Sequence, residues 1–283
     1  MLRIFFILIF SAASFIIQAQ NLHFTVFAGL GNYQGDLQAR RITMKNAQAA
    51  FGGGVLYGIT EKLFARGLIT YGKVKAHDKD GGSNQYRNLS FSSPILEGQL
   101  GLEYDIFNLN NTVGITPYFF AGVAFYHFNP SSIDEEGAKV ELQPLGTEGQ
   151  GFYLGRKKYS LTQLSIPVGG GLKLAVNENI YIRFEAGLRK LFTDYLDDVS
   201  TTYADQQELL AYSGQKAVEM AFRTDELGQG AVYPVAGAQR GNPKSKDWYY
   251  FGTVGLSFRI QSGDGYGSGS GKKSGLGCPV NVY

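Results

Sequence analysis

The chain has 283 residues, and its 26 lysines and arginines nearly balance its 24 aspartates and glutamates. Such a balance gives no electrostatic basis for binding nucleic acid, which would need a basic surface. The lone cysteine, Cys278, excludes an internal disulfide and a cysteine-based metal cluster.

The N-terminus has the pattern of a secretory signal peptide. Arg3 supplies the positive start, residues 4–10 form an unbroken apolar run, and small residues lead to a cleavage point after Ala19. An N-terminal membrane anchor is the alternative, but the run is short and no stop-transfer pattern follows it. No later run reaches the ~20 apolar residues that a spanning helix needs. We therefore divide the chain into a signal peptide (1–19), a mature body (20–260) and a tail (261–283).

Apolar and polar residues alternate with period two along most of the mature body. Phe24 and Val26 alternate with His23 and Thr25, and similar patterns return seven times, most clearly in a long hairpin that turns at residues 177–179. Because alternate side chains of a strand point to opposite faces, this pattern predicts amphipathic β-strands. The predicted strands are, in chain order, 22–30, 47–58, 63–74, 89–104, 115–128, 161–176, 180–192 and 247–260.

The connections between these strands alternate between long and short. The short ones lie near residues 59–62, 107–112 and 176–180, and every other connection is long. Bacterial outer-membrane barrels have short periplasmic turns and longer extracellular loops. The sequence therefore predicts an all-β protein whose residues 20–260 form an antiparallel transmembrane β-barrel of about eight strands. We expect it in the outer membrane, in contact with membrane lipid. A soluble secreted β-sandwich is the weaker alternative.

In such a barrel the apolar side of each strand faces lipid and the polar side faces the lumen. An eight-stranded barrel is only wide enough for its side chains to fill. We therefore expect the inward charges to form an ion-paired plug, and we rank a small porin or a ligand-binding barrel second. The predicted lumen charges are Arg66, Glu97, Glu103, Lys173, Arg183, Glu185, Arg189 and Arg259.

Aromatic residues cluster at the predicted strand ends, where interfacial girdles form in membrane barrels. The residues expected there are Tyr57, Tyr71, Tyr104, Phe125, Tyr126, Trp248 and Tyr249.

Polar residues near the predicted strand ends are considered as a catalytic site. His77 or His127, with Asp78 and Ser131 close in sequence, could form an acyl-transfer site at the extracellular rim. We rank this enzymatic hypothesis low because a catalytic triad is defined by its geometry, which the spacing of these residues does not fix. We expect no catalytic residues and no cofactor.

In the longest insertion, residues 193–246, the sequence predicts a short helix between Asp205 and Phe222. Asp194, Asp197 and Asp198 precede it, but they lack the spacing of an EF-hand, so a capped loop start is favoured over a calcium site. The Gly/Ser-rich tail has the composition of a flexible linker and would lie in the periplasm.

Three stretches carry a family resemblance: NYQGDL (32–37), FTDYLDDVSTTY (192–203) and RGNPKSKDWYYF (240–251), together with the Cys-Pro near the C-terminus. They resemble the Bacteroidota outer-membrane barrel family that includes PorG, a component of the type IX secretion and gliding machinery. The resemblance implies a non-enzymatic anchor or scaffold that associates with periplasmic ring proteins of the PorK and PorN kind. The motif residues are Asp194, Tyr195, Asp197, Asp198, Arg240, Asn242, Pro243, Asp247 and Trp248.

Overall fold

A computed structural model describes residues 22–38, 43–80, 84–109, 114–228 and 230–260. The expected signal peptide (1–19) and the tail (261–283) with Cys278 lie outside these described residues. Among the described helices, none is long and apolar enough to cross a membrane.

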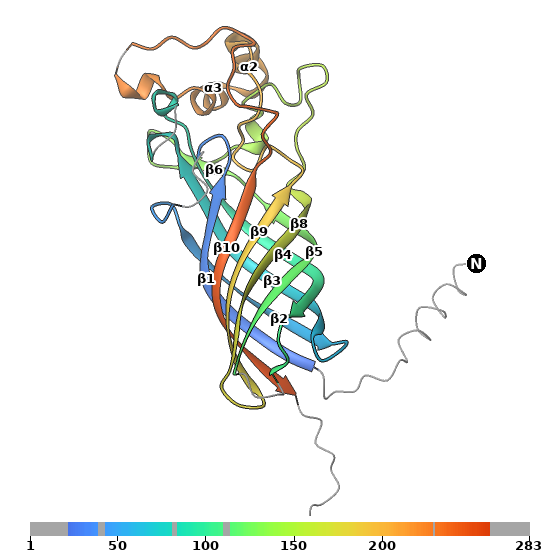
Figure 1. Cartoon of the computed structure of the whole chain (residues 1–283). Helices are drawn as coiled ribbons and strands as arrows, with labels where there is room; N and C mark the ends of the chain where they lie inside the picture. The colour runs from blue at the N-terminus through green and yellow to red at the C-terminus, as the bar shows by residue number, and fades with distance from the viewer. Residues whose placement is uncertain (1–21, 39–42, 81–83, 110–113, 229, 261–283) are drawn as a thin grey trace, which may run out of the picture.

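Eight antiparallel strands form a closed barrel (Figure 1). Each strand pairs with the next along the chain, and the last pairs with the first from Leu22↔Ile260 to Gln34↔Trp248, so the barrel wall has no free edge. This confirms the predicted fold class. The barrel strands are β1 (Leu22–Gln34), β2 (Gln48–Gly58), β3 (Leu63–His77), β4 (Ser90–Asp105), β5 (Ile115–Phe128), β8 (Thr162–Ala175), β9 (Ile180–Leu191) and β10 (Trp248–Ile260).

The structure extends two strands beyond the predicted bounds and adds one hairpin. β1 continues to Gln34 and β3 to His77, because the backbone there pairs with β10 and β4 although the sequence is polar. A short hairpin, β6 (Ser131–Ile133) and β7 (Lys139–Glu141), lies in a segment predicted as a loop. Strands of three residues are too short to show a period-two pattern.

The apolar side of the barrel wall faces outward. Leu100 and Ile69 are 68% and 65% exposed, whereas Glu97 and Glu103 on the opposite face of β4 are fully buried. A soluble protein buries its large apolar side chains, so this inverted pattern is that of a wall surrounded by lipid. The predicted outward and inward faces are therefore confirmed.

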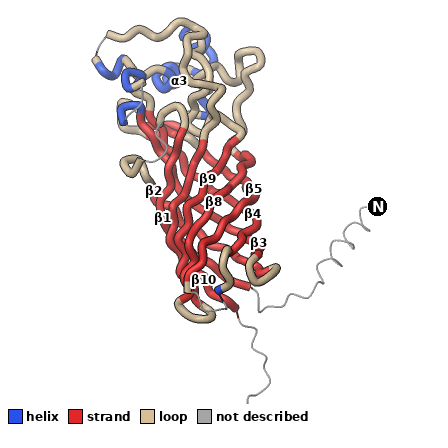
Figure 2. The backbone as a smooth tube through the Cα atoms, in the orientation of Figure 1, coloured by secondary structure: helices blue, strands red, loops and turns tan. Residues whose placement is uncertain are grey.

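One end of the barrel carries short turns, and the other carries long loops that fold into a cap (Figure 2). The predicted helix at 205–222 is two helices in this cap, α2 (Gln206–Ser213) and α3 (Gln215–Ala221). Gly214 separates them, and its φ of +82° favours glycine. The Asp205 side chain caps α2 by accepting hydrogen bonds from the backbone N–H groups of Gln207 and Glu208.

The cap rests on an apolar core that continues into the barrel. Leu196 and Val199 from the longest loop pack in one buried cluster with Phe91, Tyr126 and Tyr249 of the barrel strands. The prediction that Tyr126 and Tyr249 belong to an outer girdle is therefore wrong, since both are fully buried with ring centroids 5.4 Å apart. Their strand neighbours point outward, so one-residue alternation places these two tyrosines inside.

We expect Leu100→Lys to lower the free energy of unfolding in lipid vesicles by roughly 2–4 kcal/mol, because a lysine there faces the middle of the hydrocarbon layer. Leu154→Lys is the matched control, since Leu154 is exposed in a loop of the cap. Denaturant titration of the folded barrel measures both. Equally small losses of stability in the Leu100→Lys and Leu154→Lys variants would contradict a lipid-facing wall.

Candidate functional site

The centre of the lumen holds an ion-pair network organised around Glu103 of β4. This carboxylate accepts hydrogen bonds from Arg183 of β9 at 3.0 and 2.5 Å and from Arg66 of β3 at 3.4 Å. Lys173 of β8 lies 3.1 Å from the same carboxylate. A buried carboxylate is stable only when it is paired and hydrogen-bonded. Three cations from three strands therefore converge on one fully buried anion.

Two further carboxylates neutralise the excess positive charge. Glu185 accepts hydrogen bonds from Arg66 at 2.9 and 3.1 Å and from the Tyr118 hydroxyl at 2.9 Å. Asp105 lies 2.6 Å from Lys173. The network thus contains three cations and three carboxylates. Asp105 was not among the predicted lumen charges, although it lies on the same face of β4 as Glu103, where the period-two alternation points to the lumen.

Aromatic rings and glycines complete the packing around these charges. The guanidinium carbon of Arg66 lies 3.9 Å from the centre of the Phe120 ring, and that of Arg183 lies 4.6 Å from the Tyr118 ring. Such stacking stabilises a desolvated guanidinium. A Cβ atom on Gly187 would lie 2.7 Å from the Phe120 ring, so only glycine leaves room for this ring in the lumen.

A second ion pair lies nearer the long loops. Arg189 of β9 donates to Glu97 of β4 at 3.0 and 3.1 Å, and the Tyr249 hydroxyl donates to the same carboxylate at 2.6 Å. The Phe251 ring packs against the Arg189 guanidinium, 4.7 Å from its central carbon. This pair is charge-neutral, like the larger network.

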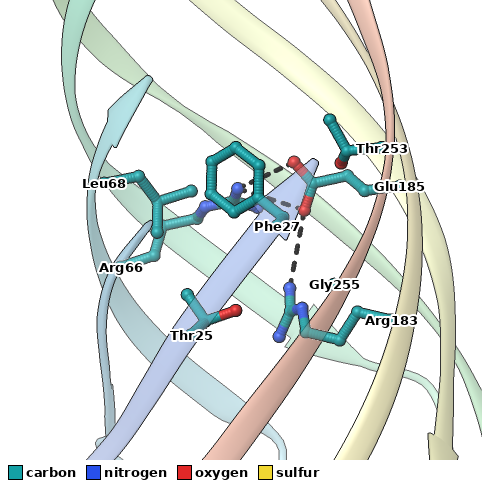
Figure 3. Close-up of a pocket in the computed structure, with 8 residues that line it drawn as sticks. All are labelled: Thr25, Phe27, Arg66, Leu68, Arg183, Glu185, Thr253 and Gly255. Carbon is teal, nitrogen blue, oxygen red and sulfur yellow. Dashed lines mark hydrogen bonds and ion pairs between the residues drawn. The ribbon is translucent and has the colours of Figure 1, made fainter. Parts of the chain in front are cut away.

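Little open space remains beside the larger network. The central cavity measures about 10 Å³ and is bordered by Arg66, Arg183, Glu185, Phe27 and neighbouring side chains (Figure 3). This volume holds about one water molecule. Side chains of the network therefore fill most of the space around this cavity.

The eighth predicted lumen charge, Arg259, lies at the short-turn end of the lumen. Arg259 borders a separate cavity of about 380 Å³ at the short-turn end, together with His23, Glu61, Asp105 and Lys173. This mouth is polar and ends at the buried ion pairs.

Residues of the stretches 192–203 and 240–251 surround a buried carboxylate that was not predicted, Glu148. Arg240 donates to this carboxylate at 3.0 Å and to the Asp198 carbonyl at 2.6 Å. The backbone N–H groups of Ser200 and Thr201 also donate to it, both at 2.9 Å, and the Tyr195 hydroxyl does so at 3.2 Å. Glu148 stands in a polar, glycine-rich loop without periodicity, so no local signal marked it.

Asp198 ties the longest loop to the loop before β8. Its carboxylate accepts hydrogen bonds from the Thr147 hydroxyl at 2.6 Å and from the Tyr159 hydroxyl at 2.7 Å. Its φ of +65° is in the left-handed region, which aspartate tolerates better than most residues. These contacts hold a tight turn in place within the cap.

Tyr33, at the end of β1, joins two more motif carboxylates. Its hydroxyl lies 2.5 Å from Asp197 and 3.1 Å from Asp247. Asp197 and Asp247 also accept backbone hydrogen bonds from Val199 and Leu196, at 3.0 and 2.9 Å. Because a tyrosine hydroxyl carries one proton, it donates to one carboxyl at a time.

The remaining motif residues lie at the edge of this core. The Ser200 hydroxyl donates to Asp194 at 2.8 Å, and the Asn242 backbone N–H donates to Asp36 at 2.8 Å. Pro243 is exposed, and Trp248 is half-buried at the start of β10. The motif thus maps mostly onto the interior of the cap. Its aspartates bind hydroxyl and N–H donors, which is the arrangement of a capped loop.

Burial changes the proton affinity of several cap carboxyls. It raises the pKa of Asp194 to about 7, and the charge of Asp36 acts in the same direction. Burial likewise raises the pKa of Asp198 to about 6, although Arg240 opposes it. The pKa values of Asp197 and Asp247 are raised well above the usual range by burial and by neighbouring carboxylates. The cap core therefore retains protons that exposed aspartates would lose.

The rim residues considered for acyl transfer have other partners. His127 is exposed, with its Nδ1 atom 3.0 Å from the Thr162 hydroxyl. Ser131 is buried and donates to the Ser92 carbonyl at 2.9 Å, and Asp78 forms an ion pair with Arg87 at 2.6 Å. Among the described rim residues, the hydrogen bond of Ser131 therefore goes to the backbone and not to a histidine.

Residues 2–147, just over half of the chain, match a family described as a domain of unknown function (DUF6089). The chain belongs to this family. The DUF6089 match ends in the loop before β8, so β8, β9 and β10 lie beyond it. Among curated proteins, none matches the chain.

Several solved barrels are similar to this DUF6089 protein in structure. Neisserial surface protein A has 10% sequence identity and a TM-score of 0.43, over 84% of this chain and 97% of its own. The outer membrane protein OprG from Pseudomonas aeruginosa has 11% identity and a TM-score of 0.40, over 85% and 98%. Ail, the attachment invasion locus protein of Yersinia pestis, has 8% identity and a TM-score of 0.40, over 85% and 99%.

We expect Glu97→Leu to lower the free energy of unfolding by about 3–5 kcal/mol, because it leaves the Arg189 guanidinium buried without its carboxylate. The double variant Glu97→Leu/Arg189→Met removes both charges and should recover most of this loss. Denaturant titration of the single and double variants measures the coupling. Additive losses would show that the two side chains do not interact.

The stability of the cap should fall as pH rises. The folded-state pKa values of Asp194 and Asp198, about 7 and 6, exceed the usual 3.8, so the folded cap binds more protons than the unfolded chain between these values. The stability they contribute is complete at low pH and is lost as pH rises through about 6 to 7. We expect faster amide hydrogen exchange in residues 193–203 at pH 8 than at pH 5, after correction for intrinsic rates. Asp194→Asn should reduce the difference, whereas the exposed control Asp225→Asn should preserve it.

Proposed function

We propose that this DUF6089 protein is a non-enzymatic anchor of the outer membrane. The observation that carries the proposal is the filled lumen, where balanced ion pairs and aromatic rings leave a central cavity of about 10 Å³. A pore requires a continuous aqueous path, and buried ion pairs that fill an eight-stranded barrel argue against such a path. The folded material outside the wall is the cap and the short turns, so these surfaces are the ones available for interaction.

The proposed location rests on the apolar outer wall. A closed barrel satisfies every backbone hydrogen bond within its wall, which is the condition for crossing lipid with strands. The expected signal peptide supports export, and the alternation of turn and loop lengths supports an orientation with the short turns in the periplasm and the cap outside the cell.

We further propose a role in type IX secretion, as a scaffold that contacts periplasmic ring proteins of the PorK and PorN kind. Three stretches of sequence that resemble the family including PorG support this role. Two of them, 192–203 and 240–251, contribute most of the polar core of the cap. Residues that hold the cap together suit a structural component better than a catalytic one.

Site-directed cross-linking tests the scaffold role. Cys278 is the single cysteine, so a Cys278→Ser background allows one reactive cysteine to be placed at will. Glu178 is exposed in the short turn between β8 and β9, and Glu135 is exposed in the cap between β6 and β7. We expect Glu178→Cys, but not Glu135→Cys, to cross-link to a periplasmic ring protein in cells. Absence of any ring component from the Glu178→Cys adducts would refute the scaffold role.

Planar-bilayer recording separates the anchor from the alternative of a small porin. The closed lumen should give no stepwise current above that of the empty bilayer. Steady ohmic steps from the purified wild-type protein would favour the porin instead.

A further inference from the structure

The outer wall has a concave apolar region near the cap. This groove lies across β1, β10 and β9, has a volume of about 770 Å³, and is bordered by Leu30, Met44, Leu188, Trp248 and Tyr250 among others. It belongs to the lipid-facing surface, so in a membrane hydrocarbon chains are its natural contents. Its place beside the long loops puts it in the outer half of the wall.

The depth of the groove comes from two small residues at its floor. Gly252 of β10 and Ala186 of β9 are paired across the sheet, and both point outward. The row beside them toward the cap is formed by Tyr250 and Leu188. A Cβ atom on Gly252 would meet no heavy atom within 4 Å, so the space above it is open.

Lysines stand at the cap side of this groove. Lys190 is exposed and is the cross-strand partner of Trp248, which borders the groove. Lys246 is exposed two residues before Trp248, and its ammonium group donates to the Pro243 carbonyl at 3.0 Å. Lys190 makes no ion pair with the residues that the structure describes. A cationic rim therefore adjoins an apolar cleft.

On the rest of the outer wall that the structure describes, positive charges lie only at the end of the barrel nearest the cap. Outward-facing positions of the eight described barrel strands include no aspartate or glutamate, and their charged residues are Lys73, Lys75 and Lys190. All three lie at the ends of their strands nearest the cap. The opposite border, toward the short turns, has apolar and tyrosine side chains at the equivalent positions. Such asymmetry suits a leaflet whose headgroups are anionic.

We propose that the groove binds one phosphorylated lipid of net negative charge from the outer leaflet, with an acyl chain over Gly252 and Ala186 and the phosphate beside Lys190 and Lys246. Apolar burial supplies part of the affinity, and each lysine near the headgroups adds about fivefold. Trp248 and Tyr250 lie where amphipathic rings are favoured, at the boundary between chain and headgroup. This inference rests on the outer-membrane location proposed above.

The test uses the purified full chain in phosphatidylcholine nanodiscs that contain a small fraction of lipid A. Native mass spectrometry measures the lipid A that each variant retains. Gly252→Leu fills the groove, and Lys190→Ala/Lys246→Ala removes the rim charges. The matched controls are Gly98→Leu, at an outward position of β4 that is equally open for a Cβ atom, and Lys75→Ala, at an outward position of β3.

We expect wild type to retain lipid A in preference to phosphatidylcholine. Retention should fall about tenfold or more in the double lysine variant, from the loss of two cation–phosphate contacts. Gly252→Leu should lower it severalfold, and both controls should match wild type. Equal retention by all variants, or equal retention of phosphatidylcholine and lipid A by wild type, would overturn the proposal. Membrane fractionation distinguishes this failure from failure of the proposed location, which would remove the protein from the outer-membrane fraction.

Discussion

The narrow circumference of the barrel is the constraint on which the rest of the structure depends. Eight strands enclose a space that side chains fill, so every inward charge is removed from water and needs a partner of opposite sign. Glu103 meets this need for three cations at once, and Glu185 and Asp105 bring the group to neutrality. Closure of the lumen is therefore a consequence of barrel size together with charge balance.

The same closure links the wall to the cap. Tyr33 and Tyr249 face each other in register where β1 meets β10, and each donates a hydrogen bond to a buried carboxylate. Tyr33 reaches upward to the loop carboxyl of Asp197, while Tyr249 reaches the Glu97–Arg189 pair inside the barrel. The apolar cluster that contains both tyrosines also contains loop residues such as Leu196. Cap and barrel thus share one continuous core, which suits a rigid anchor.

The distribution of charged residues differs between the lumen and the outer wall. The two ion-paired groups in the lumen hold carboxylates and cations in equal number, whereas the outward positions of the described strands have lysines without carboxylates, and only near the cap. Lipid contact accounts for the apolar belt, and an anionic leaflet accounts for the sign of the charge at its border. The groove beside Trp248 combines both properties in one place.

The sequence alone determined the eight barrel strands, the faces of those strands and the alternation of short turns with long loops. It could do so because side chains alternate along a strand, and because loop length is read directly from the chain. This alternation was sufficient to predict that Arg183 and Glu103 point into the lumen. Short or polar elements gave no such signal, so the β6–β7 hairpin and the extended end of β1 escaped prediction.

Only the tertiary structure decided which groups meet. Arg183 and Glu103 are 80 residues apart, and their contact depends on strand register and on the tilt that brings β4 and β9 to the same level across the lumen. Glu148 lies at the centre of the cap through contacts with two stretches of the longest loop, 195–200 and Arg240, neither of which is periodic. Alternation assigns a side chain to a face, whereas a partner on another strand is fixed by three-dimensional closure alone.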